Sequence, residues 1–354
     1  MELHFSFGII YILSFIGSHP NHDHDPAWKQ KRRASVEVKE GILSTTKETA
    51  SQIEHPEDTM EYTNCNLCSA NDAQHLYEID GFNLVRCQRC GLIYVNPRLM
   101  SKEIEKIYAE PEYFHNPKFY DFDGFLYGYA EYVSEREEIE KSFEKTVKRL
   151  ETFKPSGRLF EVGCGLGYFL DVAHQRGWEV TGIEISKSAA RYAHLLGLNV
   201  LCGSFEDQML PPLSFDAGVL LDVIEHLHDP TSVLRTAHRL LKPGAVLVIG
   251  TPNAGSLISR ILGSRWEDMR RVREHLYLFS RQTLTQMLAK AGFQVVEVTQ
   301  YGRYFKVGQI LKRWELYHRG LARSLAQLSR VIGLHDKIFY IVPYTKMIVF
   351  AKKI

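Results

Sequence analysis

Arg158–Ala173 reads RLFEVGCGLGYFLDVA, and this stretch decides the fold. An apolar run of strand length comes first, three alternating glycines follow, and an apolar pattern with helical spacing begins at Tyr168. Strand, tight turn and helix in this order make the first unit of a doubly wound α/β sheet. Glycines in the turn let a ligand approach the backbone closely. We therefore predict an α/β fold with a ligand site at this turn.

The pattern of glycines narrows the class of ligand. A dinucleotide fingerprint, G-x-G-x-x-G, would place its last glycine at Tyr168, and a P-loop would add Lys and Ser or Thr. The chain instead reads E-x-G-x-G-x-G from Glu161 to Gly167. A second expected strand, Trp178–Ile183, ends at Glu184, about 20 residues beyond the glycines, where a carboxylate can bind both ribose hydroxyls. These features predict an adenosine ligand without a pyrophosphate.

Further motifs follow in order, namely IEIS at 183–186, VLCGSFED at 200–207, FDAGVLLDVIEHLHDP at 215–230 and LLKPGAVLVIGTPN at 240–253. As a set, they resemble the class I S-adenosylmethionine-dependent methyltransferases over roughly residues 159–302. The resemblance implies a Rossmann-like, seven-stranded sheet with an antiparallel last strand, covered by helices on both faces. It also implies a cofactor site. Glu161, Gly163, Gly165 and Gly167 would meet the methionine end, Glu184 the ribose, Ser204 and Phe205 the adenine, and Leu221 or Asp222 the sulfonium.

The chemistry of the cofactor agrees with this assignment. Its amino group calls for a nearby acid, and its carboxylate calls for open backbone amides. Methyl transfer is an in-line displacement, so the acceptor and the methyl must be held collinear in a dry pocket. A base is also needed when the acceptor is a hydroxyl or an acidic carbon.

His226 is the candidate base, because it follows the fourth expected strand at the edge where open α/β sheets bind ligands. Its ordinary pKa near 6.5 suits proton removal at neutral pH, although the ring could instead cap or pack the following helix. Glu225 could orient the imidazole or bind a divalent ion. Family members with this Glu-His pair include quinone-ring O-methyltransferases and sugar methyltransferases. Some sugar C-methyltransferases also begin with a four-cysteine zinc module, but they carry Tyr in place of Val223 and a further C-terminal domain, which makes C-methylation the weaker alternative.

Four of the six cysteines form two Cys-x-x-Cys pairs, at Cys65 and Cys68 and at Cys87 and Cys90. This spacing is typical of a four-thiolate zinc ribbon, and the sequence around Asp80-Gly81 predicts two short strands between the pairs. Four thiolates leave zinc no open position, so the ion would be structural. A redox role for one pair is the alternative. Such thiol usage indicates a reducing compartment and favours a cytoplasmic protein.

The remaining chain is predicted to divide around these two parts. The expected ranges are 1–59 as a disordered leader or mis-assigned start, 60–100 as the zinc ribbon, 101–155 as a helical lid or linker, 156–302 as the S-adenosylmethionine-binding core, and 303–354 as a helical insertion plus final strand. Leu3–Gly17 is apolar like the middle of a signal peptide, but no Lys or Arg precedes it. The aromatic-rich stretch 113–129 is expected either to cover a pocket or to pack the junction of ribbon and core.

Two later stretches are candidates for acceptor or partner contacts. Trp266–Ser280 gathers three arginines with His275 before an aromatic pair, and its arginines could recognise a phosphate or carboxylate, or form a solvated helix. Residues 303–334 combine an apolar stripe with several basic residues. That pattern suits peripheral docking on an anionic membrane, core packing or a dimer contact.

Composition excludes some classes of function. Lys and Arg number 43 against 42 Asp and Glu, and the ribbon carries few cations, so nucleic acid is not an expected partner. We predict O-methylation of a sugar, glycan or lipid-linked glycan acceptor with S-adenosylmethionine as cofactor and a structural zinc. The alternatives are a quinone or other aromatic-ring O-methyltransferase and a non-catalytic zinc-ribbon interaction protein. The sequence does not indicate an oligomeric state.

Overall fold

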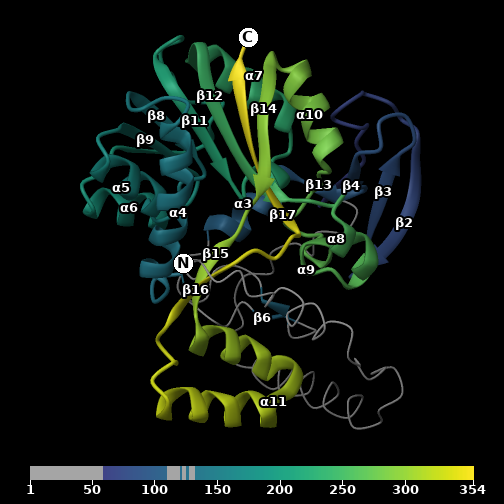
Figure 1. The fold of residues 1–354 in the computed structure, drawn as a ribbon. Coiled ribbons are helices and arrows are strands. Elements are labelled where there is room, and N and C mark those ends of the chain that lie inside the picture. The colour runs from purple at the N-terminus through teal and green to yellow at the C-terminus, as the bar shows by residue number, and fades with distance from the viewer. Residues whose placement is uncertain (1–58, 110–119, 122–124, 127–131) are drawn as a thin grey trace, which may run out of the picture.

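The computed structural model describes residues 59–109, 120–121, 125–126 and 132–354 (Figure 1). The expectations for residues 1–58 and for most of the aromatic stretch 113–129 therefore lie outside the described residues. Among the described helices, none is long and apolar enough to cross a membrane.

A seven-stranded mixed sheet forms the centre of the molecule, in the order β10-β9-β8-β11-β12-β17-β14. The strands are β8 (Arg158–Val162), β9 (Glu179–Glu184), β10 (Val200–Cys202), β11 (Phe215–Leu221), β12 (Leu241–Pro252), β14 (Phe293–Gln300) and β17 (Lys346–Lys353). β17 pairs antiparallel with both neighbours, and the other pairs are parallel. Every residue of β11 is buried, as expected for a strand covered on both faces. The predicted fold, including its antiparallel last strand, is confirmed.

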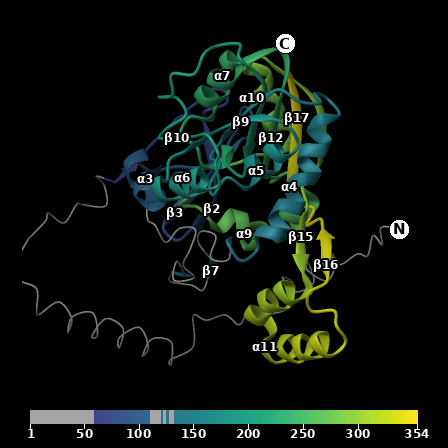
Figure 2. The same ribbon diagram turned by 90° about the vertical axis from the view of Figure 1, so that its left-hand side faces the viewer.

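Helices cover both faces of this sheet (Figures 1 and 2). One buried cluster joins the sheet to α4 (Arg136–Glu151), α5 (Tyr168–Gln175) and α6 (Lys187–Leu195). A second cluster joins the opposite face to α7 (Pro230–Leu240) and α10 (Arg281–Lys290). In α4 the buried residues include Ile139, Val147 and Leu150, which recur at the helical spacing read from the sequence.

The cysteine-bearing residues form a small sheet in the order β13-β4-β3-β2. Its strands are β2 (Ala73–Ile79), β3 (Phe82–Cys87), β4 (Ile93–Val95) and β13 (Tyr277–Leu278), and a separate pair joins β1 (Met60–Glu61) to β5 (Arg98–Leu99). Asp80 and Gly81 connect β2 to β3 with positive φ angles of 49° and 78°, which confirms the hairpin predicted at this dipeptide. The fourth strand, β13, comes from a distant part of the chain and was not predicted.

The small sheet packs against the body that carries the large sheet. Cys65, Cys87 and Leu92 belong to the same buried cluster as Phe160 and Val162 of β8. Apolar burial of this kind is the main stabilising contribution to a contact between two modules. The helix α3 (Ser101–Ala109) follows the small sheet in the chain.

The segment between β14 and β17 forms a hairpin of two helical arms that projects from the body (Figures 1 and 2). β15 (Arg303–Lys306) pairs with β16 (Ile338–Ile341) at its base, and α11 (Val307–Val331) changes direction at His318, whose φ and ψ are −138° and 66°. The change of direction lies two residues before Gly320. Shorter elements are η4 (Ile224–His226), α8 (Leu257–Leu262), η5 (Gly263–Arg265), α9 (Glu267–Arg270), β6 (Tyr120–Asp121) and β7 (Phe125–Leu126).

Candidate active site and metal centre

The glycine turn between β8 and α5 has a backbone conformation that residues with side chains rarely adopt. Gly163, Gly165 and Gly167 have φ angles of 68°, 52° and 83°. A Cβ atom placed on Gly163 would lie 2.6 Å from Cγ2 of Val223. Glycine is therefore required there for both conformation and space. The same contact shows that the residues after β11 lie against the turn.

Two buried carboxyl groups lie behind this turn. The carboxylate of Glu184 accepts hydrogen bonds from the backbone N–H groups of Gly165 and Ser186, each at 2.8 Å. Glu161 is 3% exposed, and its Oε2 has no hydrogen-bond partner among the described residues. Burial raises the pKa of both carboxyls, and the charge of Glu184 adds to the effect at Glu161. A cationic donor such as an amino group would satisfy the unpaired oxygen, so these residues fit the methionine end of S-adenosylmethionine.

The other predicted cofactor residues lie in three different environments. Ser204 donates its hydroxyl hydrogen to Glu206 at 2.9 Å. The ring of Phe205 stacks in the core with a centroid distance of 5.4 Å to Phe160, so a contact with adenine would have to use its backbone. Leu221 is buried at the end of β11, and the next residue, Asp222, forms an ion pair of 2.9 Å with Lys346. Their roles toward the cofactor stay predictions.

Glu225, His226 and His275 form a cluster beyond the end of β11. Their potential ligand atoms all lie within 4.8 Å of one another, and the two imidazole centroids are 4.8 Å apart. Glu225 is 1% exposed; its Oε2 accepts a hydrogen bond from Thr251, while its Oε1 has no partner among the described residues. The sequence predicted the Glu-His pair as a candidate, whereas only the folded chain brings His275 beside it.

Hydrogen bonds set the proton positions on both imidazoles. Nδ1 of His226 lies 3.0 Å from the carbonyl oxygen of Glu274, and Nδ1 of His275 lies 2.8 Å from that of Asp268. A carbonyl oxygen can only accept, so these contacts favour a proton on each Nδ1 and a lone pair on each Nε2. The hydroxyl of Tyr108, on α3, also lies 2.9 Å from Nδ1 of His226.

The pKa values of this cluster differ from those expected from the sequence. Burial, reinforced by the positive charge of Arg271, lowers the pKa of His226 to about 3. The same two causes lower the pKa of His275, and burial together with the charge of Asp222 raises that of Glu225. The ordinary imidazole pKa assumed for His226 therefore does not hold for the buried ring. Two neutral imidazoles and a carboxyl are suited either to accept a hydrogen bond from an acceptor or to hold a divalent cation.

The four predicted zinc ligands lie together in the small sheet. Sγ of Cys65 is 3.4 Å from that of Cys90, Sγ of Cys68 is 3.4 Å from that of Cys87, and all four sulfurs lie within 4.8 Å. Burial raises the pKa of Cys65 to about 11 and also raises that of Cys90. Burial acts in the same direction on Cys87, but hydrogen bonds from the Cys90 backbone and from Cys68 lower its pKa to about 7. Four thiolates in this space need a cation, and the donor set fits zinc.

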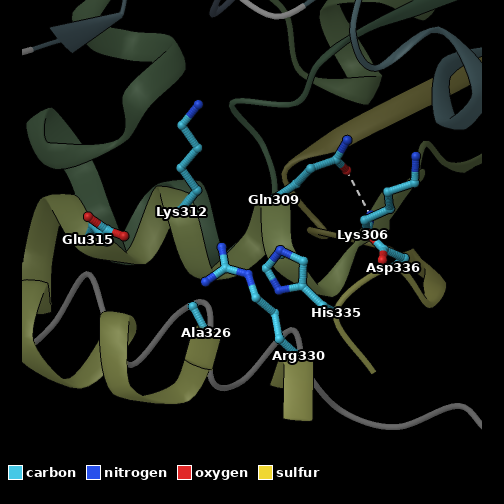
Figure 3. A pocket seen from close by; sticks show the side chains of 9 residues that line it. Lys306, Gln309, Lys312, Glu315, Ala326, Arg330, His335 and Asp336 are labelled. Atoms are coloured by element: carbon cyan, nitrogen blue, oxygen red, sulfur yellow. Dashed lines mark hydrogen bonds between the residues drawn. The ribbon is translucent and has the colours of Figure 1, made fainter. Parts of the chain in front are cut away.

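A recess of about 350 Å³ lies between the arms of the α11 hairpin (Figure 3). Its lining side chains are Lys306, Gln309, Lys312, Glu315, Ala326, Arg330, His335 and Asp336, with Gly308. Cations and acids are mixed there, and none of the predicted cofactor or catalytic residues contributes. The recess is therefore separate from the site at the glycine turn.

Replacing one cysteine of the cluster is expected to abolish zinc binding. Wild type purified under reducing conditions with added zinc should hold about one ion per chain, because four thiolates complete one tetrahedral shell. Cys68→Ser should lose the ion, as measured by mass spectrometry of metals on the intact protein. Cys202→Ser is the control, since Cys202 is exposed and lies outside the cluster. Equal zinc content in wild type and Cys68→Ser would contradict the assignment.

The lowered pKa of His226 predicts a loss of stability as the pH falls. The unfolded imidazole takes up a proton near pH 6.5 and the folded one only near pH 3, so the unfolded state binds more protons between these values. From pH 7 to pH 5, this residue should lower the free energy of unfolding by roughly 2 kcal/mol. Urea denaturation at both pH values should show wild type losing this much relative to His226→Asn. The raised pKa of Glu225 changes the free energy of unfolding in the opposite direction, but it does so in both proteins. A difference in the free energy of unfolding between wild type and His226→Asn that is the same at pH 7 and pH 5 would rule the prediction out.

Residues 132–298 match the protein family described as "Methyltransferase domain". An uncharacterized protein of Methanocaldococcus jannaschii is 27% identical over 179 residues, which is 51% of this chain and 83% of that protein. The ubiquinone biosynthesis O-methyltransferase of Alkalilimnicola ehrlichii is 34% identical over 120 residues, or 31% of this chain and 48% of the enzyme. The chain thus spans about half the length of the O-methyltransferases that it matches.

Among solved structures, a methyltransferase of Thermotoga maritima described as a possible histamine N-methyltransferase has 22% identity and a TM-score of 0.43, covering 64% of this chain and 95% of that one. An S-adenosylmethionine-dependent methyltransferase of Archaeoglobus fulgidus has 20% identity and the same TM-score, covering 63% and 99%. The family match carries the assignment, and it includes the glycine turn and the Glu225-His226 pair. Over residues 132–298, the chain therefore matches the methyltransferase domain family.

Proposed function

We propose that this protein methylates a hydroxyl oxygen of a small acceptor. When bound, S-adenosylmethionine supplies an activated methyl group on its sulfonium. The observation that supports the proposal is the close approach of Val223 to Gly163, because Val223 is two residues before the start of the Glu225-His226 pair in the chain. An acceptor bound at that pair would lie next to the cofactor, as in-line transfer requires.

The residues at the turn would hold the cofactor by charge and by hydrogen bonds. Oε2 of Glu161 offers a buried acceptor to the amino group, and the turn amides offer donors to the carboxylate. We assign the ribose to Glu184, whose carboxylate is already held at the turn by Gly165 and Ser186. These roles follow from the donor and acceptor properties of each group.

We assign the acceptor proton to Nε2 of His226. The contact of Nδ1 with the Glu274 carbonyl favours a lone pair on Nε2, which is the nitrogen that would accept the proton. With a pKa of about 3, however, this imidazole is a weak base. A phenolic hydroxyl ionises near pH 10 and an aliphatic hydroxyl only at much higher pH, so the ring of a quinol is the acceptor that such a base can serve best. Similarity to ubiquinone biosynthesis O-methyltransferases supports the same acceptor class.

A sugar, glycan or lipid-linked glycan hydroxyl is the second acceptor class. Arg273, exposed on the segment that carries His275, could recognise a phosphate on such a substrate. Contact of residues 303–334 with a membrane also stays a prediction. The exposed Leu321 and Leu328 lie on one side of the second arm of α11, and Arg319 and Arg323 lie on another, as follows from about 100° per residue.

Replacing Glu184 is expected to weaken cofactor binding. Calorimetric titration of wild type with S-adenosylmethionine should give micromolar affinity, and Glu184→Ala should lose at least roughly tenfold, because a charged acceptor of ligand hydrogen bonds disappears. Glu179→Ala is the matched control, since Glu179 begins the same strand and its side chain is exposed. Equal losses in the two variants would contradict a cofactor role for Glu184.

Replacing His226 is expected to slow methyl transfer without weakening cofactor binding. With labelled S-adenosylmethionine and a panel of catechols, quinols and nucleotide sugars, wild type should methylate a phenolic oxygen. His226→Gln should lower kcat by roughly 10²- to 10⁴-fold, because the proton acceptor is lost. Methylation of sugars alone would select the second acceptor class. Full activity in His226→Gln would exclude the proton-acceptor role, and a rate that depends on an added divalent cation would assign the Glu225-His226-His275 cluster to metal binding.

A further inference from the structure

One buried arginine of the cysteine-bearing module contacts both chain segments that carry the site histidines. Arg98, on β5, is 7% exposed. We propose that Arg98 is a positioning residue, which fixes the relative placement of His226 and His275. This inference rests on the proposed role of His226 in deprotonating the acceptor, with His275 beside it.

The two contacts come from a single nitrogen. Nη1 of Arg98 donates to the backbone carbonyl of His228 at 2.9 Å and to the hydroxyl oxygen of Tyr277 at 2.8 Å. His228 is two residues after His226, and Tyr277 is two residues after His275. The hydroxyl of Tyr277 in turn donates to the same carbonyl at 3.1 Å. A closed set of three hydrogen bonds thus joins the two segments.

The other side of the guanidinium is anchored within the module. Nε and Nη2 of Arg98 each lie 2.8 Å from Oε1 of Glu61, which stands opposite Arg98 in the β1–β5 pair. A buried cation needs such a partner, and the pair holds the guanidinium plane in one orientation. The imidazole of His228 adds a contact from Nε2 to the Leu99 carbonyl at 3.0 Å. The module therefore supplies a fixed support for Nη1.

Backbone pairing brings the His275 segment to this support but does not reach the other segment. The N–H of Val95 donates to the Leu276 carbonyl at 3.0 Å, and β13 pairs with β4. His226 is held instead through the Glu274 carbonyl, one residue before His275. Arg98 is a side chain of the module that contacts both segments, and it adds to the direct hydrogen bonds that Tyr277 and His226 make between them. A shift of either segment would change the distance between the two imidazoles, which are now 4.8 Å apart.

The shape of the side chain matters as much as its charge. The planar guanidinium presents several N–H donors in a fixed geometry, so Arg98 can serve Glu61, the His228 carbonyl and the Tyr277 hydroxyl together. A lysine ammonium keeps the positive charge beside Glu61 but cannot reproduce that planar arrangement of donors. Arg98→Lys should therefore fold and be only partly functional.

The test compares Arg98→Met and Arg98→Lys with Lys290→Met in the full-length, zinc-loaded protein. Lys290, on α10, donates to the Leu67 carbonyl at 2.7 Å, so its replacement also removes a cationic contact between module and core, away from the histidine segments. The measurements are hydrogen exchange of peptides covering 223–229 and 271–280, the imidazole NMR signals of His226 and His275, affinity for S-adenosylmethionine, and kcat.

In Arg98→Met we expect faster exchange in both peptides, shifted signals of both imidazoles, and a kcat lower by roughly ten- to a hundredfold, since misplaced groups react poorly. Cofactor affinity should stay within about twofold of wild type, because Glu161 and Glu184 lie at other strands. Arg98→Lys should recover part of kcat, and Lys290→Met should resemble wild type in all four measurements.

Unchanged exchange and imidazole signals in Arg98→Met, or equal effects in Lys290→Met, would overturn the proposal. If Arg98→Met does not fold, Arg98→Lys decides: wild-type exchange, signals and kcat in that variant would also overturn it. Failure of the proposed function is a separate result, visible as full activity in His226→Gln, and the exchange and NMR measurements then still report whether Arg98 fixes the two segments.

Discussion

The close contact between Gly163 and Val223 is the constraint on which the site depends. A Cβ on Gly163 would come within 2.6 Å of Val223, so the absence of a side chain lets the residues after β11 pack against the turn after β8. Parallel strands end at the same edge of a sheet, which brings these two turns together in the first place. Close packing there then sets how near the Glu225-His226 pair lies to the cofactor turn.

Burial governs the chemistry of this region in two opposite ways. It raises the pKa of the carboxyls of Glu161 and Glu225 and lowers that of His226, because it disfavours each charged form. Burial therefore favours the neutral form of each group, and carboxyl oxygens of Glu161 and Glu225 have no hydrogen-bond partner among the described residues. The buried carboxyls favour a cationic cofactor, and the weakly basic imidazole favours an acidic hydroxyl. The electrostatic properties of these side chains are therefore consistent with the proposed reaction.

The cysteine-bearing module supports the segments of the site and also carries its own four-cysteine cluster. Its residues share a buried cluster with the large sheet, and its edge strand β4 accepts β13 as a partner. Arg98 extends this support to the segment after His226. Four thiolates around one zinc ion would make this module rigid for its size and a suitable base from which to hold loops of the neighbouring domain.

The sequence by itself determined the sheet, the turn and the cysteine cluster. Local patterns can be recognised from the sequence because residues close together in the chain form them. They include the first strand with its glycine turn, the carboxylate at the end of the second strand, and the two Cys-x-x-Cys pairs. Tertiary structure alone decided three other features: His275 lies beside His226, β13 joins the small sheet, and Arg98 reaches both histidine segments. It also moved the pKa of His226 to about 3. Each of these depends on burial or on contacts between residues far apart in the chain, which no spacing or periodicity encodes.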